Sequence, residues 1–506
     1  MNNISLNEFI KNERYHKRRI LKNVITNEII NSNWSNIDNV LNLIITNSIS
    51  GFINYKVDAI NCIIQMYNDN NYFSKAVKLF NNMKNMGFEQ DLVSYTIIIS
   101  SYKKDGNIDK ALELFNDMKI QNITPDLIIY TILISICIYN SNIEKAMIIF
   151  DDMRSIGIKP DVVTYTALLS TCINIGNINI STKIFKDMRA NNIIANVVTY
   201  TALISTYITG GYINNALYIF NYMKIYKIYP NIITYNIILS LYTKKENINK
   251  SIEIYNDIKI SGNEPNNITY YLLILLYNKT GYIDAAINMF YNMKSNKIIP
   301  NTNTYNIVLS IYKKDGNIKK VIKIFNEMKK VGTKPDIITY NIVISLYIKP
   351  GDINKAMILF NEMESKYIKP TIFTYNKMLS TCIKSGDTIK SLDIFNNIKN
   401  VIPDIITYTI LIQTCTIYGN IDKAIKIFEE MKLKKIIPDT YIYMVLISIC
   451  KKTKNIDKAL ELFDEMKKEK IIPNIHIYNA LLIIYKQIGN TIEVRYIMNE
   501  MNKLYE

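Results

Sequence analysis

The chain has 506 residues, of which 49% are hydrophobic, and its 60 lysines and arginines exceed its 44 aspartates and glutamates by a formal net charge of +16. No apolar run approaches the roughly 18–20 residues that a membrane-spanning helix needs, so we expect no membrane partner. The basic excess favours a polyanionic partner, because lysine and arginine that neutralise phosphates release counterions. An isoleucine-, asparagine- and lysine-rich composition is also what AT-rich coding produces.

Residues 1–20 form a basic N-terminal extension with the features of a targeting segment. Lysines and arginines cluster between Lys11 and Lys22, but Glu8 and Glu13 interrupt a kind of segment that is normally poor in acids. The sequence therefore leaves open an organellar location, with the mitochondrion as the expected compartment, and a cytoplasmic one. Residues 21–56 echo the later pattern weakly, which predicts a degenerate capping repeat at the open end of an array.

From Val57 onward, one segment recurs about thirteen times at its own length. A fixed period of this size predicts stacked helical pairs, each of which buries its apolar face only against its neighbours. The expected fold class is all-α, a right-handed α-solenoid superhelix of helix-turn-helix repeats. The repeats are Val57–Asp91, Leu92–Asp126, Leu127–Asp161, Val162–Asn196, Val197–Asn231, Ile232–Asn266, Asn267–Asn301, Thr302–Asp336, Ile337–Thr371, the shortened Ile372–Asp404, Ile405–Asp439, Thr440–Asn474 and the truncated Ile475–Glu506.

Each repeat has the same internal plan. A first helix of about a dozen residues should stop at a glycine such as Gly106 or Gly176, which can enter the left-handed region without a Cβ clash. The second helix carries alanine, phenylalanine and methionine at helical spacing, as in Ala111, Phe115 and Met118, and this stripe predicts core packing. A proline then ends the repeat, because the residue before proline resists the helical region.

Five of the six cysteines share one place in the first helix, where other repeats carry tyrosine, and we interpret them as packing residues. Equivalent atoms in stacked helices lie roughly 8–10 Å apart, which is too far for a disulfide. The five are Cys137, Cys172, Cys382, Cys415 and Cys450.

The units closely resemble the pentatricopeptide repeat family. The resemblance rests on the opening strings such as Val163-Thr164-Tyr165-Thr166, on the body Gly106–Met118 and on the exit Lys159-Pro160-Asp161. It extends from about Val57 to the C-terminus and looks like the pure P-type subclass. The competing family is the tetratricopeptide repeat, a helical scaffold with a shorter period that binds peptides, but its Trp-x-x-Leu-Gly pattern is missing here.

The resemblance implies that two residues of each repeat select one nucleotide of single-stranded RNA: the fifth residue, which follows the opening tyrosine, and the last residue. All four combinations of Thr or Asn with Asp or Asn occur, as independent choices require. The predicted base-reading residues are Asn61 and Asp91, Thr96 and Asp126, Thr131 and Asp161, Thr166 and Asn196, Thr201 and Asn231, Asn236 and Asn266, Asn301, Asn306 and Asp336, Asn341 and Thr371, Asn376 and Asp404, Thr409 and Asp439, Asn474, and Asn479.

The chemistry of these residues suits base edges. Uracil and guanine present an imino N–H to an acceptor-only aspartate, whereas adenine and cytosine present a ring acceptor beside an amino donor, which suits an amide. Threonine leaves room for a purine and asparagine reaches a pyrimidine. A structural alternative stays open, because Asp or Asn just before a helix is a favoured N-cap and the fifth residue could simply be solvated.

Two further sets of residues would hold the RNA. The resemblance implies that the second residue of each repeat sandwiches bases, although the same residues could belong to the core: Val93, Ile128, Val163, Val198, Ile233, Ile268, Ile338, Phe373 and Ile406. Lysines two residues before the glycine place would stabilise a helix C-terminus in any case and could also contact phosphates: Lys104, Lys244, Lys279, Lys314, Lys349, Lys384 and Lys452.

The function expected from this resemblance is sequence-specific binding of single-stranded RNA in post-transcriptional RNA metabolism, with one base per repeat and a target near 5′-UGGAACNUYUGN-3′. The repeats with Tyr271 and Met444 have no assigned base. The alternative is a protein scaffold that binds an extended peptide.

No catalytic function is expected. The two histidines, His16 and His476, lie far apart in the sequence, and neither a zinc motif nor a phosphate-binding loop is present. Carboxylates such as Asp109, Glu113 and Asp117 should lie on a solvated helix face. We therefore expect no cofactor, no metal and no small-molecule substrate.

Overall fold

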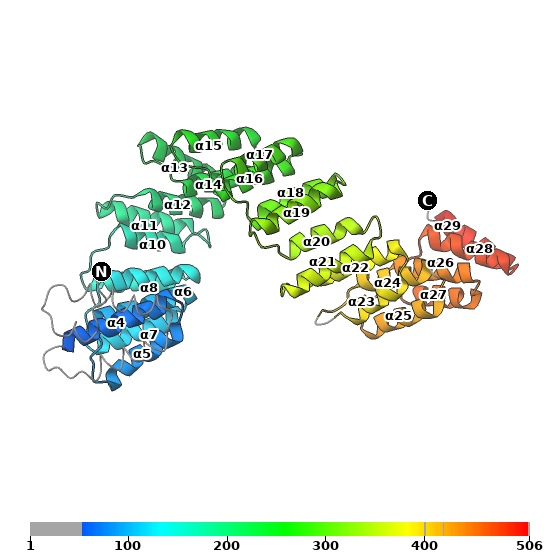
Figure 1. The fold of residues 1–506 in the computed structure, drawn as a ribbon, viewed down its shortest axis with the longest axis horizontal. Coiled ribbons are helices and arrows are strands. Elements are labelled where there is room, and N and C mark those ends of the chain that lie inside the picture. The colour runs from blue at the N-terminus through cyan, green and yellow to red at the C-terminus, as the bar shows by residue number, and fades with distance from the viewer. Residues whose placement is uncertain (1–52, 399–400, 418, 504–506) are drawn as a thin grey trace. The chain divides into compact units, whose positions relative to one another are not determined.

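The computed structural model describes residues 53–398, 401–417 and 419–503. All regular secondary structure in these residues is helical. The basic extension and most of the predicted capping repeat lie outside the described residues. The helices α4 to α29 alternate between the first and second helix of each repeat (Figure 1), which confirms the expected all-α repeat solenoid.

The first helices of the repeats begin directly after each repeat boundary, except α4, which begins at Ile53, before Val57. They are α4 (Ile53–Asp69), α6 (Leu92–Asp105), α8 (Leu127–Tyr139), α10 (Val162–Thr171), α12 (Val197–Thr209), α14 (Ile232–Lys244), α16 (Asn267–Lys279), α18 (Thr302–Lys314), α20 (Ile337–Ile344, continued by the 3₁₀ turn η1, Ser345–Tyr347), α22 (Ile372–Ser385), α24 (Ile405–Ile417), α26 (Thr440–Thr453) and α28 (Ile475–Gln487).

The second helices follow after a short turn. They are α5 (Phe73–Asn85), α7 (Ile108–Ile120), α9 (Ile143–Ser155), α11 (Ile178–Ala190), α13 (Ile213–Ile225), α15 (Ile248–Ile260), α17 (Ile283–Ser295), α19 (Ile318–Lys330), α21 (Ile353–Ser365), α23 (Thr388–Asn396), α25 (Ile421–Leu433), α27 (Ile456–Lys468) and α29 (Thr491–Lys503).

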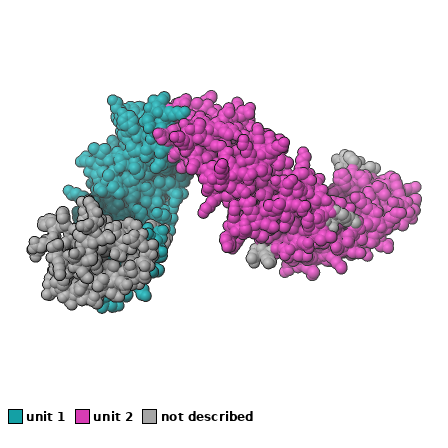
Figure 2. Space-filling view, in the orientation of Figure 1, with its two compact units in different colours: residues 1–241, 257–263 teal, residues 242–256, 264–506 magenta. Residues whose placement is uncertain are grey.

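The chain forms two compact units (Figure 2): one reaches Leu241 and includes Asp257–Asn263, and the other consists of Tyr242–Asn256 and the chain from Glu264. Within each unit, first helices pack against the first helices of neighbouring repeats, as in α6, α8 and α10. Each second helix packs against the first helix of its own repeat and of the next one, as α7 does with α6 and α8. First and second helices therefore form two layers with the core between them.

The predicted core stripe is confirmed. Ala111, Phe115 and Met118 are at most 4% exposed. The glycine prediction holds at Gly106, the left-handed C-cap of α6 with a φ of 64°. Gly176 is also left-handed, with a φ of 65°, and a Cβ there would meet the backbone nitrogen of Gly210 at 2.6 Å, but α10 ends earlier than expected, at Thr171. The five aligned cysteines are free and buried, and burial raises the pKa of the Cys137 thiol to about 11, so this thiol stays protonated at neutral pH.

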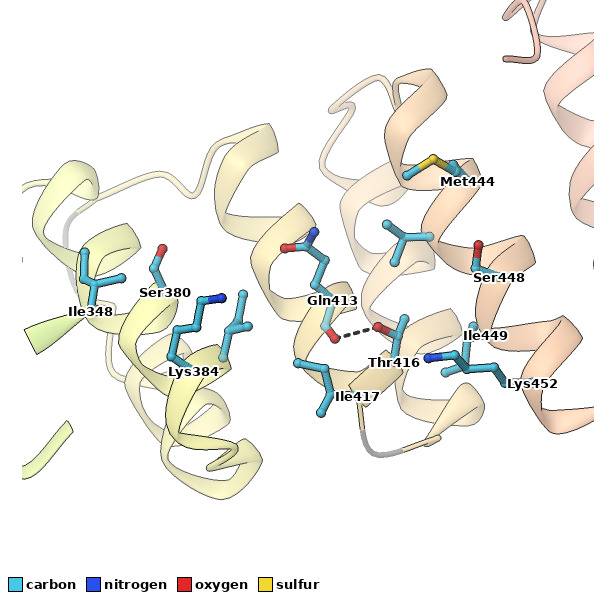
Figure 3. Close-up of a pocket in the computed structure, with 12 residues that line it drawn as sticks. Ile348, Ser380, Lys384, Gln413, Thr416, Ile417, Met444, Ser448, Ile449 and Lys452 are labelled. Carbon is cyan, nitrogen blue, oxygen red and sulfur yellow. Dashed lines mark hydrogen bonds between the residues drawn. The ribbon is translucent and has the colours of Figure 1, made fainter. Parts of the chain in front are cut away.

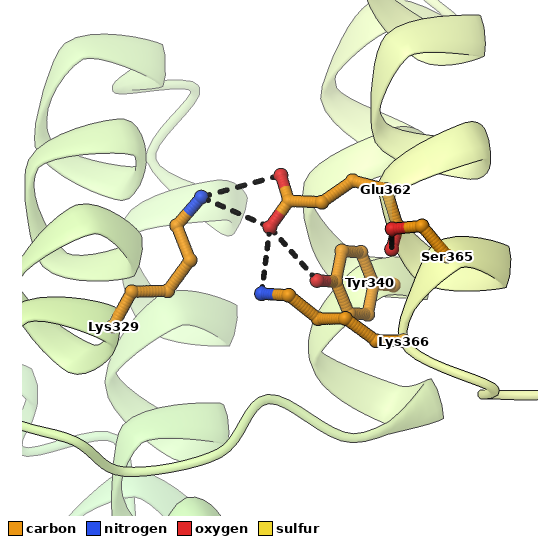
Figure 4. A network of polar contacts seen from close by, with 5 residues as sticks. All are labelled: Lys329, Tyr340, Glu362, Ser365 and Lys366. Carbon is orange, nitrogen blue, oxygen red and sulfur yellow. Dashed lines mark hydrogen bonds and ion pairs between the residues drawn. The ribbon is translucent and has the colours of Figure 1, made fainter.

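The opening tyrosine of each repeat is a structural residue, held by contacts that join successive repeats. Tyr340 is fully buried, and its ring packs edge-on against Phe325 of the preceding repeat, with centroids 5.7 Å apart. Its hydroxyl donates to Glu362 at 3.0 Å, and Glu362 also pairs with Lys329 of the preceding repeat and with Lys366 (Figure 4). One carboxylate thus connects both helices of its repeat to the repeat before.

The same network recurs along the chain and corrects one expectation. Asp117, expected on a solvated face, is half-buried and accepts a hydrogen bond from the Tyr95 hydroxyl at 2.6 Å, whereas Asp109 and Glu113 are exposed as expected. Asp152 accepts from Tyr130 and from Lys119 of the preceding repeat, both at 2.6 Å. The carboxylate at this place is therefore a packing residue that sequence periodicity alone assigned to the surface.

These contacts make stability depend on pH in a defined direction. Burial alone would raise the pKa of Glu362, but hydrogen bonds from Lys366, Lys329 and Tyr340 outweigh it and hold this pKa below its ordinary value. A carboxyl whose pKa is lowered in the folded state stabilises the fold above its unfolded pKa of about 4.3, and this contribution is lost as the pH falls through the folded value.

We expect Glu362→Gln to lower the free energy of unfolding at pH 7 by about 1–3 kcal/mol, because it removes a charged acceptor with three donors. The change is measured as a lower denaturant midpoint. The difference from wild type should shrink as the pH falls below about 4. The control is Glu364→Gln, an exposed residue of the same helix, which should leave the midpoint unchanged at pH 7. Equal effects of both variants would contradict the role of this network.

Candidate nucleic-acid interface

The second residue of each repeat is exposed, which decides between the two interpretations of these apolar side chains. Ile128 is 58% exposed, while the adjacent Ile129 and Tyr130 are fully buried. The predicted sandwiching residues Val93, Ile128, Val163, Val198, Ile233, Ile268, Ile338, Phe373 and Ile406 are all between 47% and 59% exposed. In these nine repeats the first helix presents an apolar side chain to solvent at the same place, and these residues do not belong to the core.

The last residue of each repeat is the N-cap of the next first helix. Asp126 has an extended backbone and its Oδ1 accepts the backbone N–H of Ile129 at 2.9 Å; Asn196 does the same for Thr199 at 3.0 Å. In each case the donor is the backbone N–H of the third residue of the next repeat. The same bond is accepted by Asp91, Asp161, Asn231, Asn266, Asn301, Asp336, Asp404, Asp439 and Asn474. These residues are therefore N-caps, as the structural alternative held. The cap uses only Oδ1, so the second polar atom of each side chain, Oδ2 of Asp or Nδ2 of Asn, is not used by the cap.

The fifth residues lie beside these caps and are less exposed than their predicted role suggested. Asn61, Asn236, Asn306, Asn341 and Asn376 are only 3–9% exposed, and Thr201 is 8% exposed. Thr96, Thr131, Thr166 and Thr409 are half-buried, and only Asn479, in the last repeat, is exposed. A base could therefore reach only an edge of each fifth side chain.

The structure brings the two predicted base-reading residues into contact in several repeats. The Nδ2 of Asn61 donates to Asp91 Oδ1 at 3.0 Å, and the pairs Asn306–Asp336 and Asn376–Asp404 make the same bond at 3.1 Å. In one of the two repeats without an assigned base, Asn474 Nδ2 contacts the Met444 sulfur at 3.8 Å. Residues at opposite ends of a repeat thus form one polar pair beside the exposed apolar residue.

The carboxylate of such a pair stays ionised. Burial alone would raise the pKa of Asp404, but hydrogen bonds from the backbone and hydroxyl of Thr407 and from Asn376 hold it below its ordinary value. Asp404 is therefore an acceptor at neutral pH, as the proposed match to an imino N–H requires.

The predicted phosphate-contacting lysines lie at the ends of the first helices. Lys244, Lys279, Lys314, Lys349, Lys384 and Lys452 are exposed, and the side chain of Lys104 lies outside the described residues. Lys384 and Lys452 line a groove of about 430 Å³, which is also lined by Gln413 and by the fifth residue Met444. Both ammonium groups extend into this groove (Figure 3). The groove therefore combines cationic groups with the fifth residue of one repeat.

Two sets of residues in this region were missed from the sequence. The third residue of most repeats is a buried serine or threonine whose hydroxyl contacts the base-reading pair, as Thr339 does at 2.6 Å from Asn306 Oδ1. The other set comprises the carboxylates that accept from the opening tyrosines. Both recur at fixed places in the repeat, so their regular recurrence was the signal that could have revealed them.

The comparison with protein families matches repeats along almost the whole described chain. The pentatricopeptide repeat domain matches residues 78–140, 113–175, 148–194 and 183–245, and the PPR repeat family matches 230–277, 300–345 and 335–384. The chain belongs to the pentatricopeptide repeat family. The PPR repeat model adds residues 59–88 and 268–298, and the pentacotripeptide-repeat region of PRORP matches residues 373–503. The comparison with curated proteins finds no match.

Solved structures of this family are similar to the chain. The pentatricopeptide repeat protein PPR10 from maize is 21% identical, with a TM-score of 0.52, and the match covers 97% of this chain and 81% of that one. PPR10 in complex with an 18-nt psaJ RNA element is 25% identical, with a TM-score of 0.43 over 88% of this chain and 69% of that one. The first of these likenesses supports the repeat solenoid fold.

No group of three or more His, Cys, Asp or Glu side chains among the described residues is placed to hold a metal ion. None of the described helices is both long and apolar enough to cross a membrane.

Adjacent isoleucines in α8 provide a test of the exposed apolar surface. We expect Ile129→Ala to lower the unfolding free energy by about 2–4 kcal/mol, because it empties a buried site. Ile128→Ala should change it by less than about 0.5 kcal/mol, because that side chain is already in solvent. Denaturant unfolding of both variants measures the difference, and a similar loss in both would place Ile128 in the core after all.

Proposed function

We propose that this protein binds one segment of single-stranded RNA along the first-helix surface of its repeats, with one nucleotide per repeat, and acts in post-transcriptional RNA metabolism by occupying that segment. The observation that carries this proposal is the exposed apolar second residue beside a polar pair, repeated along the helices. Apolar side chains stack on any base, while paired carboxylates and amides discriminate between base edges.

The distribution of charge supports a polyanion as the ligand. Near the ends of several second helices one lysine pairs with a carboxylate, as in Lys119–Asp152, Lys294–Glu327 and Lys432–Glu465. In contrast, Lys244, Lys279, Lys314, Lys349, Lys384 and Lys452 form no ion pair with any residue that the structure describes. The excess of positive charge thus includes the ends of the first helices, where Lys384 and Lys452 line a groove.

The base assigned to each repeat follows from its fifth and last residues. Reading the repeats from Val57–Asp91 to Thr440–Asn474 as 5′ to 3′ gives 5′-UGGAACNUYUGN-3′, in which repeats with Asn and Asp read U and repeats with Thr and Asp read G. We further propose that the chain is of the pure P-type subclass, has no catalytic activity of its own, and works in an organelle, with the mitochondrion as the expected compartment. It would stabilise a transcript end or open a hairpin that covers a splice or ribosome site.

A gel-shift titration at a stated salt concentration tests the proposal. We expect the predicted RNA to bind at least about tenfold more tightly than a control with both G nucleotides at its second and third positions replaced by A, a difference of about 1.4 kcal/mol. The double variant Asp126→Asn with Asp161→Asn should reverse this preference, because asparagine keeps the cap and changes the edge offered to the base.

Other results of this titration would change the account. Equal binding to both RNAs, weakening steeply with salt, would indicate a basic surface that holds RNA without reading it. An absence of binding to either RNA would contradict the proposal and favour a peptide as the ligand.

The exposed apolar residues give an independent prediction. Ile128→Ala should weaken binding to the predicted RNA by about threefold to tenfold, since base stacking on a side chain is worth about 1–3 kcal/mol for aromatic residues and less for aliphatic ones. The matched control is Ile148→Ala, which removes a 67% exposed isoleucine from the second helix of the same repeat. Equal affinities of the two variants, measured by the same titration, would separate the apolar surface from RNA binding.

A further inference from the structure

In six repeats, the third residue connects the two predicted base-reading residues of the repeat before it. Its side chain is buried, and its hydroxyl lies between the fifth residue and the last residue of that preceding repeat. Ser94, Thr164, Thr199, Thr234, Thr339 and Thr407 all make this connection. The contact occurs in both compact units, so it belongs to the repeat and not to one location.

The repeat Thr302–Asp336 shows the geometry. The Thr339 hydroxyl lies 2.6 Å from Asn306 Oδ1 and 2.8 Å from Asp336 Oδ1. Asp336 Oδ1 also accepts the Thr339 backbone N–H at 2.8 Å and Asn306 Nδ2 at 3.1 Å. Asn61 with Asp91 and Ser94, and Asn376 with Asp404 and Thr407, repeat these contacts.

A count of hydrogens shows what the hydroxyl does. Asp336 Oδ1 already has two N–H donors, whereas the hydroxyl is the only donor that Asn306 Oδ1 has among the described residues. The single hydroxyl hydrogen faces both acceptors, but only the amide oxygen depends on it, because a buried acceptor without a donor is costly. Hydroxyl and carboxylate together hold the amide in one orientation, with its oxygen toward Thr339 and its nitrogen toward Asp336.

This orientation determines which groups remain for a base. Asn306 keeps the second hydrogen of Nδ2, which is a donor, and Asp336 keeps Oδ2, which is an acceptor, since its contacts within the network all use Oδ1. A donor beside an acceptor matches O4 and N3–H of uracil, and it opposes the amino group and N3 of cytosine at both atoms.

We infer that the third-residue hydroxyl is a positioning residue that sets the uracil-over-cytosine preference of the preceding repeat. The inference rests on the proposed RNA binding and extends it to residues that contact no base themselves. It also explains how a residue in one repeat affects the nucleotide read by the repeat before it.

The neighbouring repeat Ile337–Thr371 is a natural contrast. It has the same fifth residue, Asn341, but its last residue is Thr371, and Thr374 at the next third place contacts Thr371. Asn341 is 9% exposed, and its Oδ1 has no hydrogen-bond partner among the described residues. The amide of this repeat is not fixed by a hydroxyl and a carboxylate, so we expect it to read uracil and cytosine about equally.

The test compares RNAs that differ only at the eighth nucleotide, U or C, which lies opposite Asn306 and Asp336. Wild type should favour U by about tenfold or more, within the usual effect of one mismatch. Thr339→Val keeps the side-chain shape and the bond from its own backbone N–H to Asp336, but it removes the hydroxyl, which also accepts the Asp336 backbone N–H at 3.2 Å. The control Thr374→Val loses the equivalent bond, from the Thr371 backbone N–H to Thr374. The preference of Thr339→Val for U should fall to about threefold or less, because Asn306 Oδ1 loses its donor. Thr339→Ser should restore the wild-type ratio, since Ser94 already serves in one repeat.

Thr374→Val is the matched control, because it removes a hydroxyl from the same place without a contact to Asn341. It should leave the U-to-C binding ratio unchanged at the ninth nucleotide, which is assigned to the repeat Ile337–Thr371. It should also leave the ratio at the eighth nucleotide unchanged. Thermal unfolding of both valine variants shows whether they fold equally well. If the hydroxyl had only a structural role, both valine variants would lose stability and neither would change its U-to-C binding ratio.

The outcomes separate the two levels of the account. A selective wild type with an equally selective Thr339→Val overturns this inference and leaves the proposed function standing. A wild type that binds both RNAs equally, or neither, overturns base reading and the inference with it.

Discussion

The N-cap at the start of each first helix is the interaction on which the rest of this structure depends. A helix leaves its first backbone N–H groups without partners, and here the last residue of the preceding repeat satisfies one of them with a single side-chain oxygen. Asp161 does this for Thr164 and Asn196 does it for Thr199, at 2.8 and 3.0 Å. Aspartate and asparagine cap equally well with Oδ1. Exchanging one for the other therefore keeps the cap and changes only the second polar atom, which is Oδ2 in aspartate and Nδ2 in asparagine.

This double use explains how a repeat can vary its chemistry at a structural position. Capping restricts the last residue to a few side chains, and these same side chains differ in whether their second atom donates or accepts a hydrogen bond. The third residue adds another constraint, since its hydroxyl joins the cap to the fifth residue, as Thr234 does between Thr201 and Asn231. On the proposed function, the atoms that cap the helices are the same few atoms that would recognise a base.

The second helices carry a different set of contacts that holds the repeats together. Buried tyrosines donate to half-buried carboxylates, which in turn pair with lysines of the repeat before, as Tyr443 and Lys432 do with Glu465. Each such pair neutralises one lysine near the end of a second helix. The six exposed lysines at the ends of the first helices, from Lys244 to Lys452, form no ion pair with a described residue, and neither do Lys319 and Lys323 of the second helix α19.

Much of this architecture could be predicted from the sequence, because it depends on patterns that repeat. The helices, the positive-φ glycines such as Gly106 and the core position of Phe115 follow from spacing and local sterics. The exposure of Ile128 beside the buried Ile129 could not be read from spacing, since two adjacent isoleucines look alike in a pattern. The roles of Thr339 and Asp117 were equally hidden, because each depends on a partner in another helix.

The contribution of the base-reading residues is tested most directly by selecting bound sequences from a random RNA pool and sequencing them. The account predicts enrichment of one motif that matches UGGAAC, followed after one free position by U, a pyrimidine, U and G, in a fixed register. It also predicts that Asp126→Asn changes only the second nucleotide of that motif. Enrichment of an unrelated motif, or of none, would contradict the claim that the fifth and last residues of each repeat read one base.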